Sequence, residues 1–188
     1  TLTGPVDNFA AGQNITVTVR AVDNYFNLVE FPAFGSPLVQ LVADDPYVAS
    51  PLVSAAPMTN GVMTTTIQLK TKNLAPGWFI TSSATASGYG FSNQVSSAIK
   101  VDAGSLTALQ ILVPGETPVP GSPTGLSGTP NTQVANVAFN IPIGNIRAVD
   151  QYFNTVSTNG TVSVTMRDPY GSPQLQSFSL SAGQNAAP

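Results

Sequence analysis

The amino-acid sequence predicts an all-β protein built from two tandem antiparallel β-sandwiches, the second of them incomplete. Three observations predict this fold: apolar residues recur at alternate positions, Gly and Pro interrupt these runs, and one stretch of sequence occurs twice. Alternation with period two indicates strands that bury one face. No window shows the sustained 3.6-residue apolar stripe of an amphipathic helix.

In the first unit, each alternating run predicts one strand. From residue 14 to residue 22, Ile15, Val17 and Val19 alternate with polar residues, and Trp78 is expected to be a large core residue. The predicted strands lie near residues 1–6, 14–22, 38–43, 50–56, 62–70, 78–86 and 94–101. Seven strands in about 100 residues is the strand count of an Ig-like sandwich. We therefore predict an Ig-like β-sandwich over residues 1–102.

The repeated stretch defines the second unit, residues 103–188. RAVDNYFN at Arg20–Asn27 returns as RAVDQYFN at Arg147–Asn154, with seven of eight residues identical. Farther along, LVADDPY at 41–47 aligns with VTMRDPY at 164–170. Because the match extends beyond the octapeptide, the octapeptide is expected to be a corner of a fold that is built twice.

The second unit departs from the first in its opening half. TALQILV at 107–113 predicts a strand in which Leu109, Ile111 and Val113 share one face. The Pro/Gly-rich stretch 114–130 is interpreted as a long surface loop inside the unit, although such composition is also typical of linkers. A slip in the alternation predicts a β-bulge near Gly144 and Asn145.

The second unit also lacks counterparts for residues 62–101. Its last residues, 180–188, align with the region just before Asn60 and Gly61. Such a sandwich would expose a sheet edge and open its core. Three explanations are open: the chain continues, it was cut, or a neighbouring molecule supplies strands by β-augmentation.

Composition excludes several functions. Charged residues make up 8% of the chain, against a typical value of about 25%, and 18 Ser and 20 Thr take their place. Six Lys and Arg without a basic cluster argue against nucleic acid as a partner, and no apolar run approaches the length of a membrane span. With neither Cys nor His, thiolate and imidazole chemistry is absent. A surface so poor in charge favours self-association.

The run AGQNITVTVRAVDNYFNLV at 11–29, the NG pair at 60–61 and the strand VMTTTIQLKT at 62–71 resemble tandem bacterial Ig-like (Big-type) repeats of secreted and cell-surface proteins. The resemblance implies stacked domains in a stalk, adhesin, coat or filament at the bacterial surface or outside the cell. It carries no catalytic set. Where the family usually has Gly before the Asn, this chain has Phe26 and Phe153.

Acidic and amide side chains at the two corners have two interpretations. One is calcium, which needs six to eight oxygen ligands. The other is an Asx-type turn whose side chains hold backbone N–H groups. The sequence contains no D-x-D-x-D-G loop, which favours the turn. The candidate calcium ligands are Asp23, Asn27, Asp45, Asp150, Asn154 and Asp168.

Aromatic and carboxylate side chains supply the remaining candidate sites. Tyr25 and Tyr152, each followed by Phe, could form a platform for sugars, although packing of these rings against core and loop is the simpler expectation. Asp44, Asp45 and Glu30 are the densest acidic neighbours, and paired carboxylates can hydrolyse glycosides. Without a further base or nucleophile we expect no enzyme and no cofactor.

The sequence therefore favours a structural repeat module of a bacterial extracellular protein, with copies of the same protein as partners. The alternative is an adhesin or a carbohydrate-binding accessory module of a secreted protein, with glycans as partners.

Overall fold

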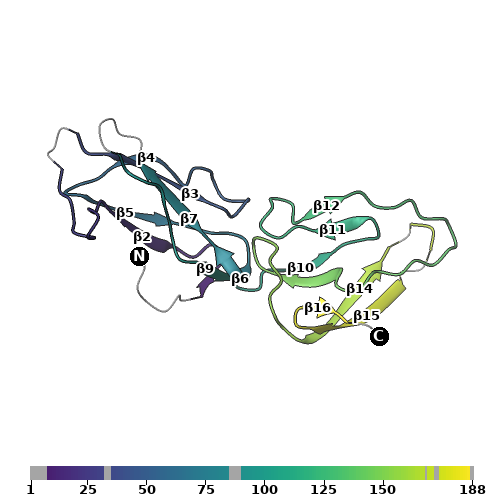
Figure 1. The fold of residues 1–188 in the computed structure, drawn as a ribbon. Helices are drawn as coiled ribbons and strands as arrows, with labels where there is room; N and C mark the ends of the chain where they lie inside the picture. The colour runs from purple at the N-terminus through teal and green to yellow at the C-terminus, as the bar shows by residue number, and fades with distance from the viewer. Residues whose placement is uncertain (1–7, 32–34, 85–89, 168, 172–173, 187–188) are drawn as a thin grey trace. The chain divides into compact units, whose positions relative to one another are not determined.

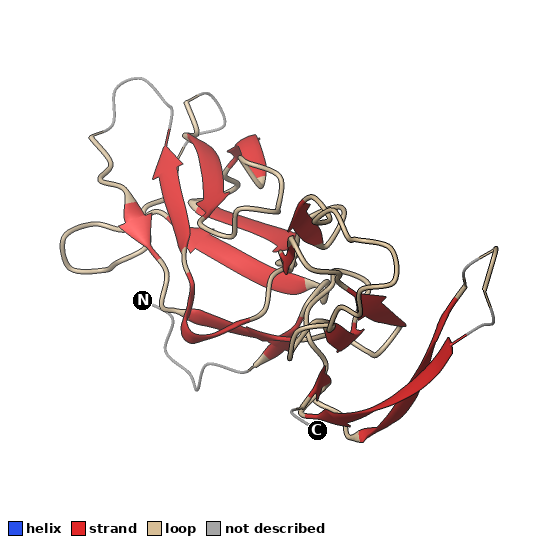
Figure 2. Ribbon diagram, turned by 90° about the vertical axis from the view of Figure 1, so that its right-hand side faces the viewer, coloured by secondary structure: helices blue, strands red, loops and turns tan. Residues whose placement is uncertain are grey.

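The computed structural model describes residues 8–31, 35–84, 90–167, 169–171 and 174–186. The regular secondary structure of these residues is entirely β-strand, as Figure 2 shows, so the protein is all-β as the alternation predicts. The chain divides into two compact units, Thr1–Asp102 and Ala103–Pro188. The described part contains no helix long and apolar enough to cross a membrane.

The described residues of unit 1 form nine strands (Figure 1). They are β1 (Phe9–Ala10), β2 (Ile15–Arg20), β3 (Leu38–Ala43), β4 (Val53–Pro57), β5 (Val62–Ile67), β6 (Asn73–Trp78), β7 (Ile80–Ala84), β8 (Gln94–Val95) and β9 (Ile99–Asp102). They form a β4-β3-β7-β8 sheet, a β1-β9-β6 sheet and the β2-β5 pair. Buried apolar side chains come from all three, which gives a sandwich-like architecture.

The alternation correctly predicts which side chains form this core. Ile15 in β2 and Met63 and Ile67 in β5 are buried, whereas Thr16, Thr18, Thr64 and Thr66 on the opposite face are exposed. Leu41 and Val101 are completely buried. Trp78 is only half-buried, and its indole N–H donates to the carbonyl of Thr71 (2.6 Å).

The predicted strands near residues 78–86 and 94–101 differ from the structure, and a third cannot be compared with it. The strand near residues 1–6 lies outside the described residues. Residues 94–101 form two short strands, β8 and β9, and Val95 is exposed. Before β7, the sequence interpretation missed β6 because it contains Pro76 and Gly77, which are disfavoured inside strands. Asn73 bridges this irregularity with hydrogen bonds to both backbone groups of Gly77.

In the described part of unit 2, five strands form one sheet and two more form a separate hairpin. The strands are β10 (Ala108–Ile111), β11 (Glu116–Pro118), β12 (Leu126–Gly128), β13 (Ile146–Val149), β14 (Gly160–Met166), β15 (Gln174–Ser181) and β16 (Gln184–Asn185). The sheet order is β10-β13-β16-β15-β14, and β11 pairs with β12. β14 and β15 pair over seven positions, from Gly160 opposite Leu180 to Met166 opposite Gln174.

The Pro/Gly-rich stretch 114–130 is more ordered than the predicted surface loop. β11 and β12 pair antiparallel within it, with Glu116 opposite Gly128. The carbonyl of Gly125 accepts a hydrogen bond from the side chain of Gln110 in β10 (2.9 Å). This hairpin therefore lies against the polar face of β10.

The bulge predicted near Gly144 and Asn145 is wrong. Residues 139–143 are not a strand, and the N–H of Asn145 donates to the carbonyl of Pro142 (3.2 Å), so the chain turns here before β13 begins. Gly144 has the predicted unusual backbone, with φ of 79°. The interruption of the apolar alternation in the sequence coincides with this turn and with the start of β13.

Unit 2 contains one more part of the repeated fold than the sequence alignment indicates. Ala182 and Gly183 adopt positive φ of 49° and 83°, as Asn60 and Gly61 do with 49° and 74°. Arg147 lies opposite Gln184 as Arg20 lies opposite Val62. β16 is thus the counterpart of the first residues of β5.

The apolar face of unit 2 is only partly covered. Ile146, Ala148 and Leu180 are buried at its centre, against the half-buried Val162, Val164 and Phe178. β10 contributes Leu109 and Ile111 to the same face, since they lie opposite Ala148 and Ile146. Contrary to the prediction that these residues face a core, they are 53% and 43% exposed, while Gln110 and Leu112 between and beyond them are buried.

Candidate functional site

The repeated octapeptide folds into the same corner in both units. In unit 1 it follows β2, and the Asp23 carboxylate accepts hydrogen bonds from the N–H groups of Tyr25 (2.8 Å) and Asn27 (2.9 Å). The Asn27 side-chain amide donates to the second carboxylate oxygen (3.0 Å). Phe26 takes a positive φ of 65° at the tip. This is the Asx-type turn that the sequence favours.

The corner in unit 2 repeats these contacts atom by atom. The Asp150 carboxylate accepts from the N–H groups of Tyr152 (2.8 Å) and Asn154 (2.9 Å) and from the Asn154 side chain (2.9 Å). Phe153 has φ of 61°. Behind each corner a glycine lies so close to the chain that a Cβ would stand 2.0 Å from a valine carbonyl oxygen: Gly61 against Val29, and Gly183 against Val156.

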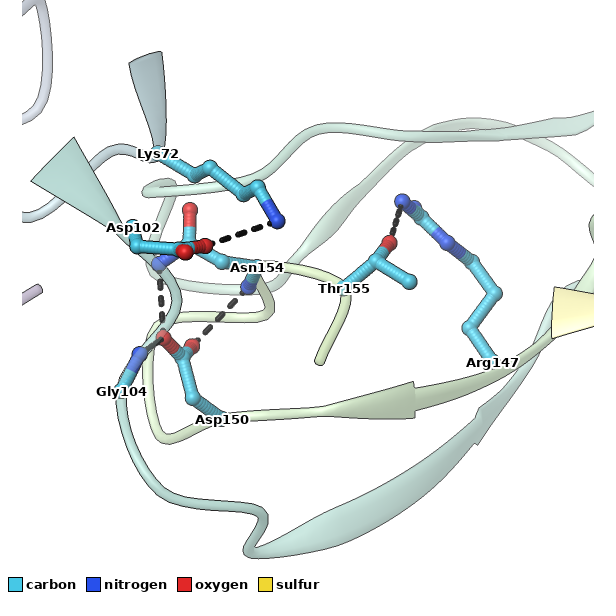
Figure 3. A network of polar contacts seen from close by, with 7 residues as sticks. All are labelled: Lys72, Asp102, Gly104, Arg147, Asp150, Asn154 and Thr155. Atoms are coloured by element: carbon cyan, nitrogen blue, oxygen red, sulfur yellow. Dashed lines mark hydrogen bonds and ion pairs between the residues drawn. The ribbon is translucent and has the colours of Figure 1, made fainter. Parts of the chain in front are cut away.

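The two corners differ in burial. Asp23 and Asn27 are exposed, whereas Asp150 is 2% exposed and Asn154 is completely buried. Asp150 also accepts a hydrogen bond from the N–H of Gly104 (2.7 Å), which Figure 3 shows beside the Asn154 amide. The side-chain amide of Asn27 is the main cause that holds the pKa of Asp23 below its usual value.

The hairpin β11–β12 covers the aromatic residues of the second corner. Gly121 donates its N–H to the carbonyl of Tyr152 (2.7 Å), and Gly125 lies against the ring of Phe153. The described residues of unit 1 contain no such insertion. The expectation that these rings pack against core and loop is therefore wrong for the first corner, where Tyr25 is 85% exposed and Phe26 is 77% exposed.

The described carboxylates that were candidate calcium ligands accept hydrogen bonds from N–H groups of the protein. Asp45 is buried and accepts from the N–H groups of Tyr47, Lys70 and Thr71 and from the Thr71 hydroxyl, whose bond is 2.7 Å long. Asp168 lies outside the described residues. In the part of the chain that the structure describes, no three His, Cys, Asp or Glu side chains form a group that could hold a metal ion.

A buried arginine near the second corner is a feature that sequence reasoning missed. Arg147 is 6% exposed and donates from Nη2 to the Thr155 hydroxyl (Figure 3). Its Nε and Nη1, and Oε1 of its cross-strand neighbour Gln110, have no hydrogen-bond partner among the described residues. Burial lowers the pKa of Arg147. The equivalent Arg20 is exposed, so no local sequence signal distinguishes the two.

These contacts make each corner a rigid support of the fold. The acidic neighbours Asp44 and Asp45 are likewise used structurally, since Asp44 accepts from the N–H of Phe79 (2.7 Å). At the first corner the rings of Tyr25 and Phe26 are exposed. Comparison of the chain with protein-family models, curated proteins and solved structures finds no match.

Proposed function

We propose that this chain is a structural repeat module of a bacterial extracellular protein, forming part of a surface coat, stalk or filament. Its work is mechanical: each unit spaces the next and contacts copies of the same protein. No catalytic step is assigned to it.

The observation that carries this proposal is the corner built twice. Asp23 and Asp150 bind the same backbone groups at matching distances, so the repeated sequence is accounted for by folding. A chain that repeats a supporting element, rather than a reactive one, is typical of repeat proteins. The low charge, 8% of residues, is consistent with close association of copies.

Sedimentation velocity on the full chain over a wide concentration range tests the proposal. The weight-average mass should rise with concentration, and electron micrographs of the concentrated sample should contain extended assemblies. A chain that sediments as a monomer throughout its soluble range would contradict the proposal.

The exposed rings of the first corner favour a second candidate, a carbohydrate-binding or adhesin module. Tyr25 and Phe26 are exposed to solvent, and exposed aromatic rings are suited to stacking on sugars. A glycan array with the full chain tests this idea. Tyr25→Ala should then abolish binding while Tyr152→Ala, at the covered corner, leaves it unchanged; a silent array rejects the candidate.

A further inference from the structure

The β11–β12 hairpin holds itself together. Its two strands pair with each other, and the N–H of Val119 donates to the carbonyl of Gly125 across the turn (2.8 Å). At the base of the hairpin the N–H of Asn131 donates to the carbonyl of Pro114 (2.7 Å). Because all these bonds lie within residues 114–131, the hairpin can move away from the sheet of unit 2 without losing them.

Glycines of the hairpin make its contacts with the strand and the corner beneath it. The carbonyl of Gly125 accepts from the side chain of Gln110 in β10 (2.9 Å), and the N–H of Gly121 donates to the carbonyl of Tyr152 (2.7 Å). Gly125 also lies against the ring of Phe153, where a Cβ would clash. The fit of the hairpin on the corner therefore depends on the absence of a side chain at residue 125.

The hairpin covers a cationic side chain that lacks hydrogen-bond partners. Arg147 lies opposite Gln110 and shares its face of the sheet, and Arg147 is 6% exposed. Its Nη2 donates to Thr155, whereas its Nε and Nη1 have neither a hydrogen bond nor an ion pair with any described residue, and Oε1 of Gln110 also has no partner there. Burial of such groups is unfavourable, and contact with water removes the penalty. Closure of the hairpin over Arg147 therefore carries a cost that opening relieves.

Unit 1 shows that the corner folds without a cover. The Asp23 carboxylate accepts the same backbone hydrogen bonds as Asp150, although no hairpin of the described residues lies over it. Arg20, Tyr25 and Phe26 are exposed there. The hydrogen bonds within the second corner therefore do not require the hairpin and should survive its opening.

We propose that residues 114–130 form a lid that opens while the sheet of unit 2 stays folded. Opening brings water to Arg147 and Gln110 and exposes the rings of Tyr152 and Phe153. The open corner then presents the residue types that are exposed at the first corner: one Arg, one Tyr and one Phe. The lid thus determines whether the chain displays one such surface or two, whatever mechanical role the units have.

Amide hydrogen exchange of the full chain, followed by NMR at increasing urea concentration, tests the lid. The N–H of Gly121 reports lid opening because it donates to Tyr152, whereas the N–H of Ala148, which donates to the carbonyl of Gly183, reports unfolding of the sheet. After correction for intrinsic rates, Gly121 should exchange at least about tenfold faster than Ala148 and with a weaker dependence on urea. Equal protection and equal urea dependence of the two amides overturn the proposal.

Replacement of the buried arginine tests why the lid opens. Arg147→Met removes the buried charge and should slow exchange at Gly121 by at least about tenfold, because closure no longer buries unpaired N–H groups. The matched control is Arg20→Met, at the equivalent exposed position, which should leave exchange at Gly121 unchanged. Faster exchange at Gly121 in Arg147→Met would show that the guanidinium holds the hairpin closed, which is the opposite of the proposal.

A glycine replacement should open the lid. Gly125→Ala places a Cβ against the ring of Phe153 and should accelerate exchange at Gly121 by at least about tenfold. Gly160→Ala, with open space around residue 160, is the control and should leave exchange at Gly121 unchanged. Equal exchange at Gly121 in the two variants contradicts the contact that seats the lid.

Chemical labelling of the wild-type chain provides a test that needs no variant. Phenylglyoxal modifies guanidinium groups that solvent can reach, and mass spectrometry of peptides identifies the labelled arginine. Arg20 should be labelled first, and Arg147 should be labelled under conditions in which the amide of Ala148 stays protected. Labelling of Arg147 that begins only when this amide loses its protection would show that unit 2 opens only as a whole, and would overturn the proposal.

Discussion

Replacement of Asp150 by alanine should destabilise unit 2 far more than the equivalent change at Asp23 destabilises unit 1. The Asp150 carboxylate accepts from four N–H groups: those of Gly104, Tyr152 and Asn154 and the Asn154 side chain. Each buried donor that loses its acceptor costs about 1–3 kcal/mol. Since the site can relax and admit water, we expect a total of about 3–5 kcal/mol, typical of removing one member of a buried charged network.

Calorimetry and fluorescence of the full chain together measure this difference. Trp78 is the only tryptophan, so its fluorescence reports the unfolding of unit 1. At about 4 °C or more per kcal/mol, Asp150→Ala should lower the unit 2 transition by at least about 12 °C without moving the fluorescence transition. Asp23→Ala should move the fluorescence transition only slightly, because water replaces the exposed carboxylate. Equal shifts in the two variants would refute the link between burial and stability.

Three further predictions follow from the same corners. Gly183→Ala and Gly61→Ala each place a Cβ 2.0 Å from a backbone oxygen at positive φ and should cost at least about 2 kcal/mol in urea denaturation, whereas Gly160→Ala, with open space around it, should be close to neutral. Ala182→Asn should stabilise unit 2 by about 0.5–1 kcal/mol, because Asn tolerates the left-handed backbone that Ala182 adopts at φ of 49°; an unchanged melting temperature would contradict this. Asn27→Ala should raise the pKa of Asp23 toward its usual value of 3.8 in an NMR titration. Because the folded pKa is the lower one, the stabilisation by Asp23 is present above pH 3.8 and is lost as the pH falls through the folded pKa.

Local patterns were sufficient to predict most strands of unit 1. The alternation around Ile15 and Met63 places their side chains in the core, because a period of two leaves one face for burial. It failed at β6, where Pro76 and Gly77 hide a strand whose irregularity Asn73 supports. The octapeptide also predicts its own hydrogen bonds, since an Asp four residues before an Asn can bind the backbone between them.

Local sequence patterns could not predict which part of the chain covers each strand or turn. Arg20 and Arg147 occupy the same position in octapeptides that match at seven of eight residues, yet only Arg147 is buried. The difference arises from residues 114–130, whose composition indicates a loop and gives no sign of a hairpin that folds over β10 and the corner. Likewise, Ala182 is an unusual residue for a left-handed turn, so its equivalence to Asn60 emerges only from the backbone.

The corner has a consequence for the order of folding. The side-chain hydrogen bonds that Asp23 and Asp150 share span at most four residues, so forming them requires closing only a very short loop. Pairs such as β3 with β7 join residues about forty positions apart and carry a larger entropic cost. On a chain emerging from the ribosome, we expect each corner to form as soon as its eight residues are released. The strands that complete the sheet would then dock onto a turn that already exists, in unit 2 as well as in unit 1.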